Sequence, residues 1–190
     1  MFESFRSRFP VSDEQWNTYQ SYFQRREFPA RTVLLAEGAI STKAYYIEKG
    51  AVRVWFDHNG SEITSQFFFE HQSVSSIESF KKSIPSRLSI ETIEPSVLWE
   101  IERQHIDRIL DEIMEIKALR DLVMDMLFER TFHYMDHFFS YIRDTPEQRY
   151  LHLLEHSPHV VQRVQQHYIA SYLGISSVHL SRIKSKIAGK

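Results

Sequence analysis

Several side chains near the carboxyl end of the chain have the types and spacing needed to read the edges of DNA bases. When the segment SSVHLSRIKSK is placed around a helix, five of them fall on one side: Ser177, Val178, Ser181, Arg182 and Ser185. The planar guanidinium of an arginine on such a face can donate two hydrogen bonds to a guanine in the major groove. Arg182 is therefore the strongest candidate for reading a base.

Basic residues close to this face are suited to phosphate contacts, which hold a protein on DNA without reading its sequence. They are Lys184, Lys186 and Arg163. Between Ser157 and Lys190 the chain has five basic residues and no acidic one, so 18 of its 23 basic residues and all 25 acidic residues lie upstream. This contrast predicts that the carboxyl-terminal segment meets an anion such as nucleic acid, with an ordinary solvated surface as the alternative for each lysine.

The apolar residues of QQHYIASYLGISSVHLSRIK match the inward positions of a helix-turn-helix: Ile169, Leu173, Ile175, Leu180 and Ile183. Ala170 is small where the two helices must approach each other, and Gly174 stands at the turn, where glycine can adopt the left-handed backbone that ends the first helix. Ser176 or Ser177 can then cap the second helix. The segment predicts a helix-turn-helix, with an accidental helical hairpin as the alternative.

The elements that must position these residues begin with short strands between Glu27 and about Ile101. Apolar, β-branched and aromatic residues dominate the runs, which suggests an antiparallel barrel or jelly roll. Asn59-Gly60 predicts a tight hairpin turn between two of them. The expected strands are Thr32–Leu35, Ala44–Ile47, Ala51–Phe56, Ile63–Phe69, Leu88–Ile93 and Val97–Ile101.

Helical spacing starts after Glu102, with a short segment at Gln104–Leu110 and a long helix from about Ile113 to Ile142. Thirty residues of helix span about 45 Å, which is more than one small barrel can cover, so a partner helix is expected along the apolar stripe. Packing within one protomer is the alternative. The stripe predicted to form the dimer interface comprises Ile116, Leu119, Val123, Met126, Leu127, Arg130 and Tyr134, and it continues to Phe138 and Tyr141.

A further helix is predicted to begin at Asp144-Thr145-Pro146-Glu147, with Thr145 as its cap and Pro146 as its first residue. It runs to about Glu155. Ser157-Pro158 then breaks the helix, and the β-branched run VVQRV is expected to form a short strand.

The composition excludes several classes of protein. The chain has no cysteine, which excludes disulfides, cysteine-ligated zinc and thiolate-held iron–sulfur clusters. No run of about 18 apolar residues is present, and the segment MFESFRSRFP lacks the apolar core of a signal peptide. The expected compartment is the cytoplasm, with no membrane contact.

Neither a metal site nor catalysis is expected. His152, Glu155 and His156 spell H-x-x-E-H, but no third ligand is apparent, and ordinary packing is favoured for this pair and for His133 and His137. The β region has no metal-binding signature and no nucleophile with an evident base. We therefore expect no catalytic residue.

Over nearly all of its 190 residues the chain resembles the Crp-Fnr family of bacterial transcription regulators. The resemblance rests on LLAEGAISTKAYYIEKGAVRVWF, with Gly38 and Gly50 at its turns, on TPEQRYLHLLEHSP, and on YIASYLGISSVHLSRIK. It implies a β-roll of the cyclic-nucleotide-binding type, a long dimer helix, and a homodimer that reads two half-sites one helical turn apart. In the family's pattern the base-reading positions fall on Ser177, Val178 and Arg182. The family's β wing has no counterpart before Lys190, so a short wingless form is expected.

The same resemblance implies a degenerate effector pocket. Cyclic-nucleotide members of the family have a glycine-rich phosphate cassette, with a glutamate for the ribose hydroxyl and an arginine for the cyclic phosphate. The corresponding stretch here is EHQSVSSIESFKKSIPSRLSIET, which places Ser76 at the glutamate position and Ser86 at the arginine position. No glycine lies between Gly60 and Gly174. Binding of cAMP is therefore not expected.

The sequence leaves open whether this pocket binds a ligand other than cAMP. Arg87 is expected to point outward, because a shift of one residue along a strand turns the side chain to the opposite face. Ser75 and Ser76 can cap a short helix whose free amides still bind an anion. An empty pocket and a different, unknown effector are the two alternatives.

These inferences predict an α+β chain with an antiparallel, jelly-roll-like β-roll over residues 1–110, a dimerisation helix over 111–143 and a helix-turn-helix domain over 144–190. The expected function is a homodimeric, sequence-specific transcription regulator of the Crp-Fnr type, with double-stranded DNA as partner, RNA polymerase as a further candidate, and no cofactor. The alternative is a ligand-binding sensor or protein-interaction module whose terminal helices dock a protein. The effector, the operator, the target genes and the direction of regulation stay open.

Overall fold

The computed structural model describes residue 6 and residues 11–189, which divide into two compact units. The first unit comprises the residues up to Arg53 together with Phe68–Glu129, and the second comprises Val54–Phe67 together with the residues from Arg130 onward. Most of the segment considered as a signal peptide, and the basic residue Lys190, lie outside the described residues.

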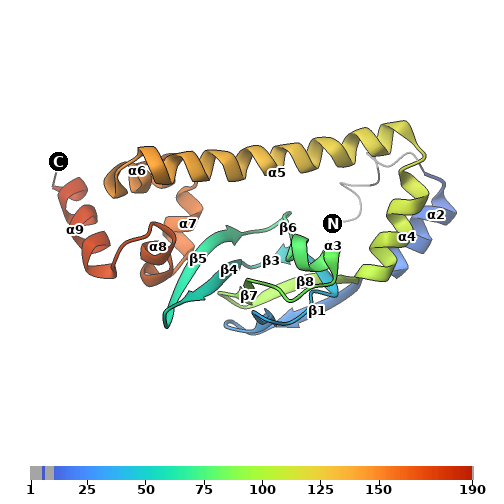
Figure 1. Ribbon diagram of the computed structural model, residues 1–190, viewed down its shortest axis with the longest axis horizontal. Helices are drawn as coiled ribbons and strands as arrows, with labels where there is room; N and C mark the ends of the chain where they lie inside the picture. Colours follow the sequence, from blue (N-terminus) through green and yellow to red (C-terminus); the bar gives the residue numbers. More distant parts are fainter. Residues whose placement is uncertain (1–5, 7–10, 190) are drawn as a thin grey trace. The chain divides into compact units, whose positions relative to one another are not determined.

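The β-strands form two four-stranded sheets (Figure 1). In the first sheet the order is β1 (Gln24–Phe28), β8 (Ser96–Glu102), β3 (Lys43–Lys49) and β6 (Ser73–Val74), and every neighbouring pair is antiparallel. In the second sheet the order is β2 (Val33–Leu35), β7 (Ser89–Thr92), β4 (Val52–His58) and β5 (Ser61–Phe68). The core includes side chains from both sheets that are almost completely buried: Ile47, Val52, Val74, Ile90 and Leu98. The predicted jelly-roll-like fold is confirmed, and all six predicted strands are present.

The turn between β4 and β5 lies where the sequence placed it. Asn59 and Gly60 both have positive φ, 54° and 79°, as a two-residue hairpin turn of the I′ type requires. The Asp57 carboxylate accepts a hydrogen bond from the Gly60 N–H at 3.1 Å and stabilises the turn. The local sequence therefore predicted this turn correctly.

Two of the elements carry no apolar signal that reveals them in the sequence. Helix α2 (Asp13–Ser21) begins with a capping box, in which the Ser12 hydroxyl and the Gln15 side chain accept from each other's backbone N–H. Strand β1 has the largely polar sequence QRREF and pairs on one side only, with β8. An edge strand with this little buried surface lacks the alternation that marks a half-buried strand.

The predicted short helix at Gln104–Leu110 is α4 (Arg103–Ile113), and the predicted long helix over Ile113–Ile142 is α5 (Lys117–Arg143), with a break between them at residues 114–116. At the break the Ile116 N–H bonds to the Ile113 carbonyl, and the Arg120 guanidinium donates to the Met114 carbonyl at 3.0 Å. These two hydrogen bonds satisfy carbonyl groups at the end of α4 that would bond to backbone N–H groups if the helix continued. The long helix is therefore shorter at its amino end than predicted.

The break changes the predicted dimer interface. Leu119 is fully buried in a cluster with Val11, Tyr19 and Ile113 of the same protomer. Ile116 and Val123 pack against this cluster. The assignment of Leu119 to the interface is therefore wrong, because its side chain has no surface left for a partner.

Four helices complete the chain: α6 (Pro146–His156), α7 (Pro158–Arg163), α8 (Gln166–Tyr172) and α9 (Ser177–Ala188). As predicted, Thr145 caps α6 and Pro146 is its first residue. The strand expected at VVQRV is wrong, since this run lies in and directly after α7. Pro158 starts that helix, and burial of Val160 and Val164, four residues apart, outweighs the β propensity of the valines. Among the described residues no helix is both long and apolar enough to span a membrane.

Replacing Gly50 with alanine is expected to destabilise the protein by about 3–5 kcal/mol, since a clash adds to backbone strain. The φ of Gly50 is +101°, and an added Cβ would lie 2.3 Å from Ser96 Oγ and 2.7 Å from Ser96 Cα. Gly38→Ala is the matched control: its φ is +85° with nothing within 4 Å of the added Cβ, so we expect only backbone strain of about 1–2 kcal/mol. Urea unfolding measures both variants, and equal losses would contradict a clash at Ser96.

Candidate nucleic-acid interface and effector pocket

The turn between α8 and α9 lies at Gly174, where the predicted helix-turn-helix places it. Gly174 has a φ of +67°, its N–H bonds to the Ser171 carbonyl, and the Ile175 N–H bonds to the Ala170 carbonyl. This pair of hydrogen bonds is a Schellman motif, which ends α8 in the left-handed conformation that glycine tolerates. The Ser176 hydroxyl then caps α9 by accepting from the His179 N–H at 3.2 Å.

Apolar contacts hold the two helices together and leave one face of α9 free. Four of the predicted inward residues are buried: Ile169, Leu173, Leu180 and Ile183. The predicted outward residues of α9 are all exposed: Ser177, Val178, Ser181, Arg182 and Ser185. The side chain of Arg182 makes no hydrogen bond or ion pair with any other described residue, and Val178 is 62% exposed although it is apolar.

The residues predicted to contact phosphate have different surroundings. Lys186 forms an ion pair with Glu147 of α6, with 2.6 Å between Nζ and Oε2, so its charge is partly compensated. Lys184 is half-buried on α9, and Arg163 is exposed at the end of α7. Among the three, Lys186 must therefore exchange one anionic partner for another in order to reach DNA.

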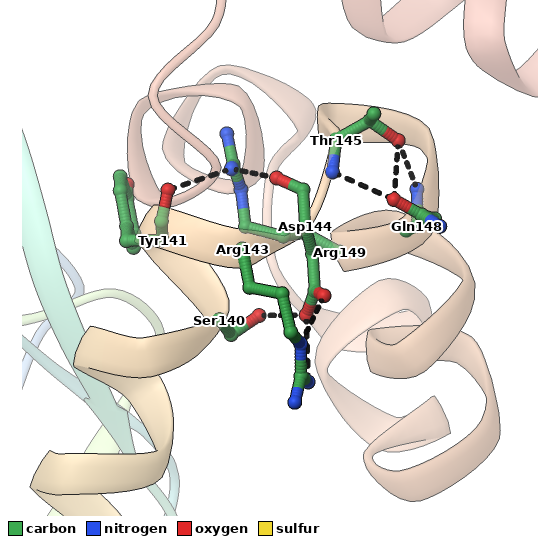
Figure 2. A network of polar contacts seen from close by, with 7 residues as sticks. All are labelled: Ser140, Tyr141, Arg143, Asp144, Thr145, Gln148 and Arg149. Atoms are coloured by element: carbon green, nitrogen blue, oxygen red, sulfur yellow. Dashed lines mark hydrogen bonds and ion pairs between the residues drawn. The ribbon is translucent and has the colours of Figure 1, made fainter.

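Arg149 in α6 bonds to the end of α5, as Figure 2 shows, and also to the end of α8, contacts that the sequence did not reveal. One of its nitrogens, Nη1, donates to the carbonyls of Asp144 at 2.7 Å and Tyr141 at 3.5 Å, while Nη2 donates to the Leu173 carbonyl at 2.8 Å. Its guanidinium also lies over the Tyr141 ring, 4.6 Å from the centroid. From the sequence, Arg149 cannot be distinguished from the many arginines that lie on helix surfaces.

A serine of α8 binds the edge of the β4–β5 hairpin within the same compact unit. The Ser171 hydroxyl donates to the Glu62 carbonyl at 2.7 Å and accepts from the Thr64 N–H at 2.8 Å. It thereby satisfies a donor and an acceptor of β5 as a neighbouring strand would. The hairpin is thus hydrogen-bonded to α8, the first helix of the predicted helix-turn-helix.

Aromatic rings continue this contact toward α5. The Phe67 ring lies 5.2 Å from the Tyr172 ring, which stacks on His137 at 4.8 Å. Burial raises the pKa of Tyr172 to about 12, so its hydroxyl stays protonated and can donate to His137 Nδ1 at 3.2 Å. Burial also lowers the pKa of His137, and the nearby His133 and Arg149 lower it further. A neutral imidazole with an accepting Nδ1 fits both effects.

The two serines at the family's ligand positions bond to each other. Ser76 and Ser86 are both buried, and their hydroxyl oxygens lie 2.8 Å apart. Ser86 Oγ also contacts the Leu88 carbonyl at 2.7 Å and accepts from the Leu88 N–H at 3.1 Å. Ser76 directly precedes α3 (Ile77–Lys82), but its side chain does not cap that helix. These hydroxyls are therefore already satisfied within the protein.

No cationic side chain at these positions replaces the missing arginine. Arg87 is exposed as predicted, although it lies in a bend before β7 and not in a strand, and Ser75 is half-buried beside Ser76. Inside the β-roll a different arginine is buried: Arg53 is 2% exposed, and its Nε and Nη2 donate to Glu91 Oε2 at 2.9 and 2.6 Å. This ion pair was not predicted from the sequence, although an arginine inside the apolar run AVRVWF is the signal that marks it.

The histidine pair of H-x-x-E-H forms no metal centre with a third ligand. The rings of His152 and His156 stack at 4.1 Å between centroids, and His156 Nδ1 lies 3.1 Å from the His152 carbonyl. No cluster of three or more histidine, aspartate or glutamate side chains placed to hold a metal is found among residue 6 and residues 11–189.

The fold matches that of known regulators. Residues 25–112 match the family model of the cyclic nucleotide-binding domain, while no curated protein sequence matches the chain. The c-di-GMP responsive global regulator CLP of Xanthomonas campestris superposes with a TM-score of 0.72 at 19% identity, covering 94% of this chain and 92% of that chain. FixK2 from Bradyrhizobium japonicum gives 0.72 at 18% identity, covering 88% and 85%. A regulator of the Crp/Fnr family from Eubacterium rectale gives 0.70 at 15% identity, covering 93% and 85%.

These likenesses identify the fold as that of the Crp/Fnr transcription regulators, with a cyclic nucleotide-binding-type β-roll followed by helices. At such identities the solved structures show the fold alone, and the chemistry of each site has to be judged from its own residues.

The stability of the protein is expected to fall as the pH drops below about 6.5, because His137 binds a proton more readily in the unfolded chain than in the fold. The neutral ring is favoured in the native state, so its contribution is present above that pH and is lost below it. His137→Gln should flatten this dependence between pH 7.5 and 5.5, measured as the urea midpoint, whereas His156→Gln should keep it. An unchanged slope in His137→Gln would assign the effect to other groups.

Proposed function

We propose that this chain is a sequence-specific DNA-binding transcription regulator of the Crp-Fnr type that acts as a homodimer. The observation that carries the proposal is the outward face of α9. It presents Arg182, Val178 and three serines to solvent on a helix whose other side is buried against α8. A helix of this kind fits the major groove, and its side chains are of the types that contact base edges.

The chemistry of this face favours DNA over a protein partner. Arg182 can donate to guanine O6 and N7, the methyl groups of Val178 can contact a thymine methyl, and the serine hydroxyls can bond to bases or phosphates. Described residues 157–189 include no acidic side chain to repel phosphate. A protein-docking surface remains the second candidate, and it would bind its partner without the steep salt dependence that counterion release gives to DNA.

The apolar surface of α5 supports a second copy as partner. Side chains along one face stay exposed in the described protomer: Met126, Leu127, Tyr134, Phe138 and Tyr141. An apolar face of this extent usually marks an interaction site. Two copies joined along α5 would carry two α9 helices, which a palindromic operator requires. RNA polymerase is a further candidate partner of such a regulator.

The effector pocket supports a regulator that does not respond to cyclic mononucleotides. A cyclic phosphate leaves water only if charge-assisted hydrogen bonds replace its hydration. The hydroxyls of Ser76 and Ser86 bond to each other instead, and the buried Arg53 is held by Glu91. Because the CLP structure is that of a c-di-GMP responsive regulator, a dinucleotide belongs among the first effectors to test.

Arg182→Ala is expected to cost about 1–3 kcal/mol of operator binding and to relax specificity at one base pair in each half-site. Lys184→Ala should instead weaken binding to all sequences and reduce the salt slope by about 1. The operator is first selected from random DNA by the wild-type protein. Fluorescence anisotropy on this operator, on its single-base variants and on unrelated DNA then separates the loss of specificity from the uniform loss of affinity. Equal losses on every DNA for both variants would remove Arg182 from base reading.

Introducing glutamate at both Leu127 and Phe138 is expected to dissociate the dimer, because two charges per protomer would have to be desolvated in the apolar contact. Both side chains are exposed in the protomer, at 48% and 61%, so the fold itself should tolerate the change. Light scattering at micromolar concentration measures the mass against the 22.7 kDa of one chain. Asp125→Lys, an exposed charge change on the same helix, is the control. A dimer in the doubly substituted protein would place the interface elsewhere.

Neither cAMP nor cGMP is expected to bind at micromolar concentration. Isothermal titration measures this directly, with Arg87→Ala as a check on the nearest unburied arginine in sequence. A dissociation constant for cAMP below about 10 μM, roughly −7 kcal/mol, would contradict the expectation. Loss of that affinity in Arg87→Ala would then identify Arg87 as the phosphate ligand.

A further inference from the structure

The last turn of α5, the Arg149 side chain and the α8–α9 turn at Gly174 together form what we call the joint. The Arg149 guanidinium bonds to both sides of this joint. We infer that Arg149 is a positioning residue that fixes the orientation of α9 relative to α5, and thereby sets the spacing of the two half-sites that the dimer accepts. The inference rests on the proposed function and adds to it a geometric rule about the operator.

The electrostatics of the joint explain why an arginine occupies it. The end of α5 and the end of α8 both direct unpaired carbonyl groups at the same place, and each helix end carries a partial negative charge. Arg149 neutralises both, through Nη1 on Asp144 and Tyr141 and through Nη2 on Leu173. The planar fork holds these donors at a fixed angle, which a lysine ammonium cannot do.

Tyr141 limits how far the two helix ends can move against each other. Its ring lies under the Arg149 guanidinium, its hydroxyl donates to the Tyr172 carbonyl, and it touches the turn. A Cβ added to Gly174 would lie 3.2 Å from Tyr141 Cε1 and 3.3 Å from its hydroxyl. The last turn of α5, the guanidinium and the α8–α9 turn therefore pack as one unit.

The consequence for DNA follows from the geometry of the duplex. Inserting one base pair between half-sites moves one of them by about 3.4 Å along the helix axis and rotates it by about 34–36°. A dimer with rigid joints cannot follow this change at both half-sites. A dimer whose joints have lost Arg149 can rotate its helix-turn-helix units and recover part of the binding.

The first test compares spacing penalties. The operator selected by the wild-type protein is measured beside versions with one base pair added or removed at its centre. We expect the wild type to lose affinity about 100-fold on the altered spacings, as for the loss of specific contacts at one half-site. On the altered spacings, the affinity of Arg149→Gln should fall less than about 5-fold below its own affinity for the original operator. The loss for Arg149→Lys should lie between those of Arg149→Gln and the wild type.

Arg143→Gln is the matched control for the first test. Arg143 is exposed in the same joint, and among the described residues its ion-pair partner is the carboxylate of its neighbour Asp144, at 2.8 Å (Figure 2). It should keep the wild-type spacing penalty. If Arg149→Gln lowers affinity but keeps the full penalty, the inference is overturned while the proposed function stands. A wild-type protein that selects no DNA overturns both.

The second test needs no DNA, so it also works if an Arg149 variant binds DNA too weakly for its affinity to be measured. Because the chain has no cysteine, Ser181→Cys gives a single spin label on α9 of each protomer, and Asp125→Cys gives one on α5. We expect Arg149→Gln and Arg149→Lys to broaden the distance distribution between the α9 labels and to leave that between the α5 labels unchanged. Equally narrow α9 distributions with and without Arg149 would overturn the inference, and circular dichroism at the same temperature excludes general unfolding as the cause of a broad one.

Discussion

The apolar surface of α5 is the constraint on which the assembly of this protein depends. Along its carboxyl half, Phe132, Phe138 and Ile142 are 53%, 61% and 70% exposed in the described protomer. Fully burying one such side chain gives about 1.5–3 kcal/mol, so several of them together strongly favour a partner. In the proposed homodimer a second copy covers this face with the same face, as two-fold symmetry requires, and the assembly carries two α9 helices. The proposed role of Arg149 is to transmit the geometry of this contact to α9.

The β-roll retains the shape of a nucleotide-binding domain with different interior chemistry. Its polar interior groups bind each other: Ser76 with Ser86, and Arg53 with Glu91. An ion pair this deeply buried costs desolvation free energy, and breaking it by removing one partner costs more. The β4–β5 hairpin residues Val54–Phe67 belong to the second compact unit, where Glu62 and Thr64 bond to Ser171 of α8.

Local signals made much of the fold predictable. The Asn59-Gly60 turn, the Thr145 cap and the outward face of α9 follow from a few neighbouring residues, because turns, caps and helix periodicity are local properties. Features decided by tertiary packing were missed or wrong. The run Val160–Arg163 became helical because Val160 and Val164 are both buried, and Leu119 joined a core with Val11 and Tyr19, which are distant in sequence. The bonds of Arg149 go to the ends of two other helices, so no local pattern could reveal them.

Selection from a random double-stranded DNA library by the wild-type protein tests most directly whether this chain reads DNA as a two-fold dimer. The enriched sequences are expected to form an inverted repeat whose half-site centres lie about 10–10.5 base pairs apart, or a multiple of this distance. Two protomers should bind each duplex, and guanine should recur at one position in both halves, as contact with Arg182 requires. Absence of enrichment, or a single unrepeated motif bound by one protomer, would contradict this account.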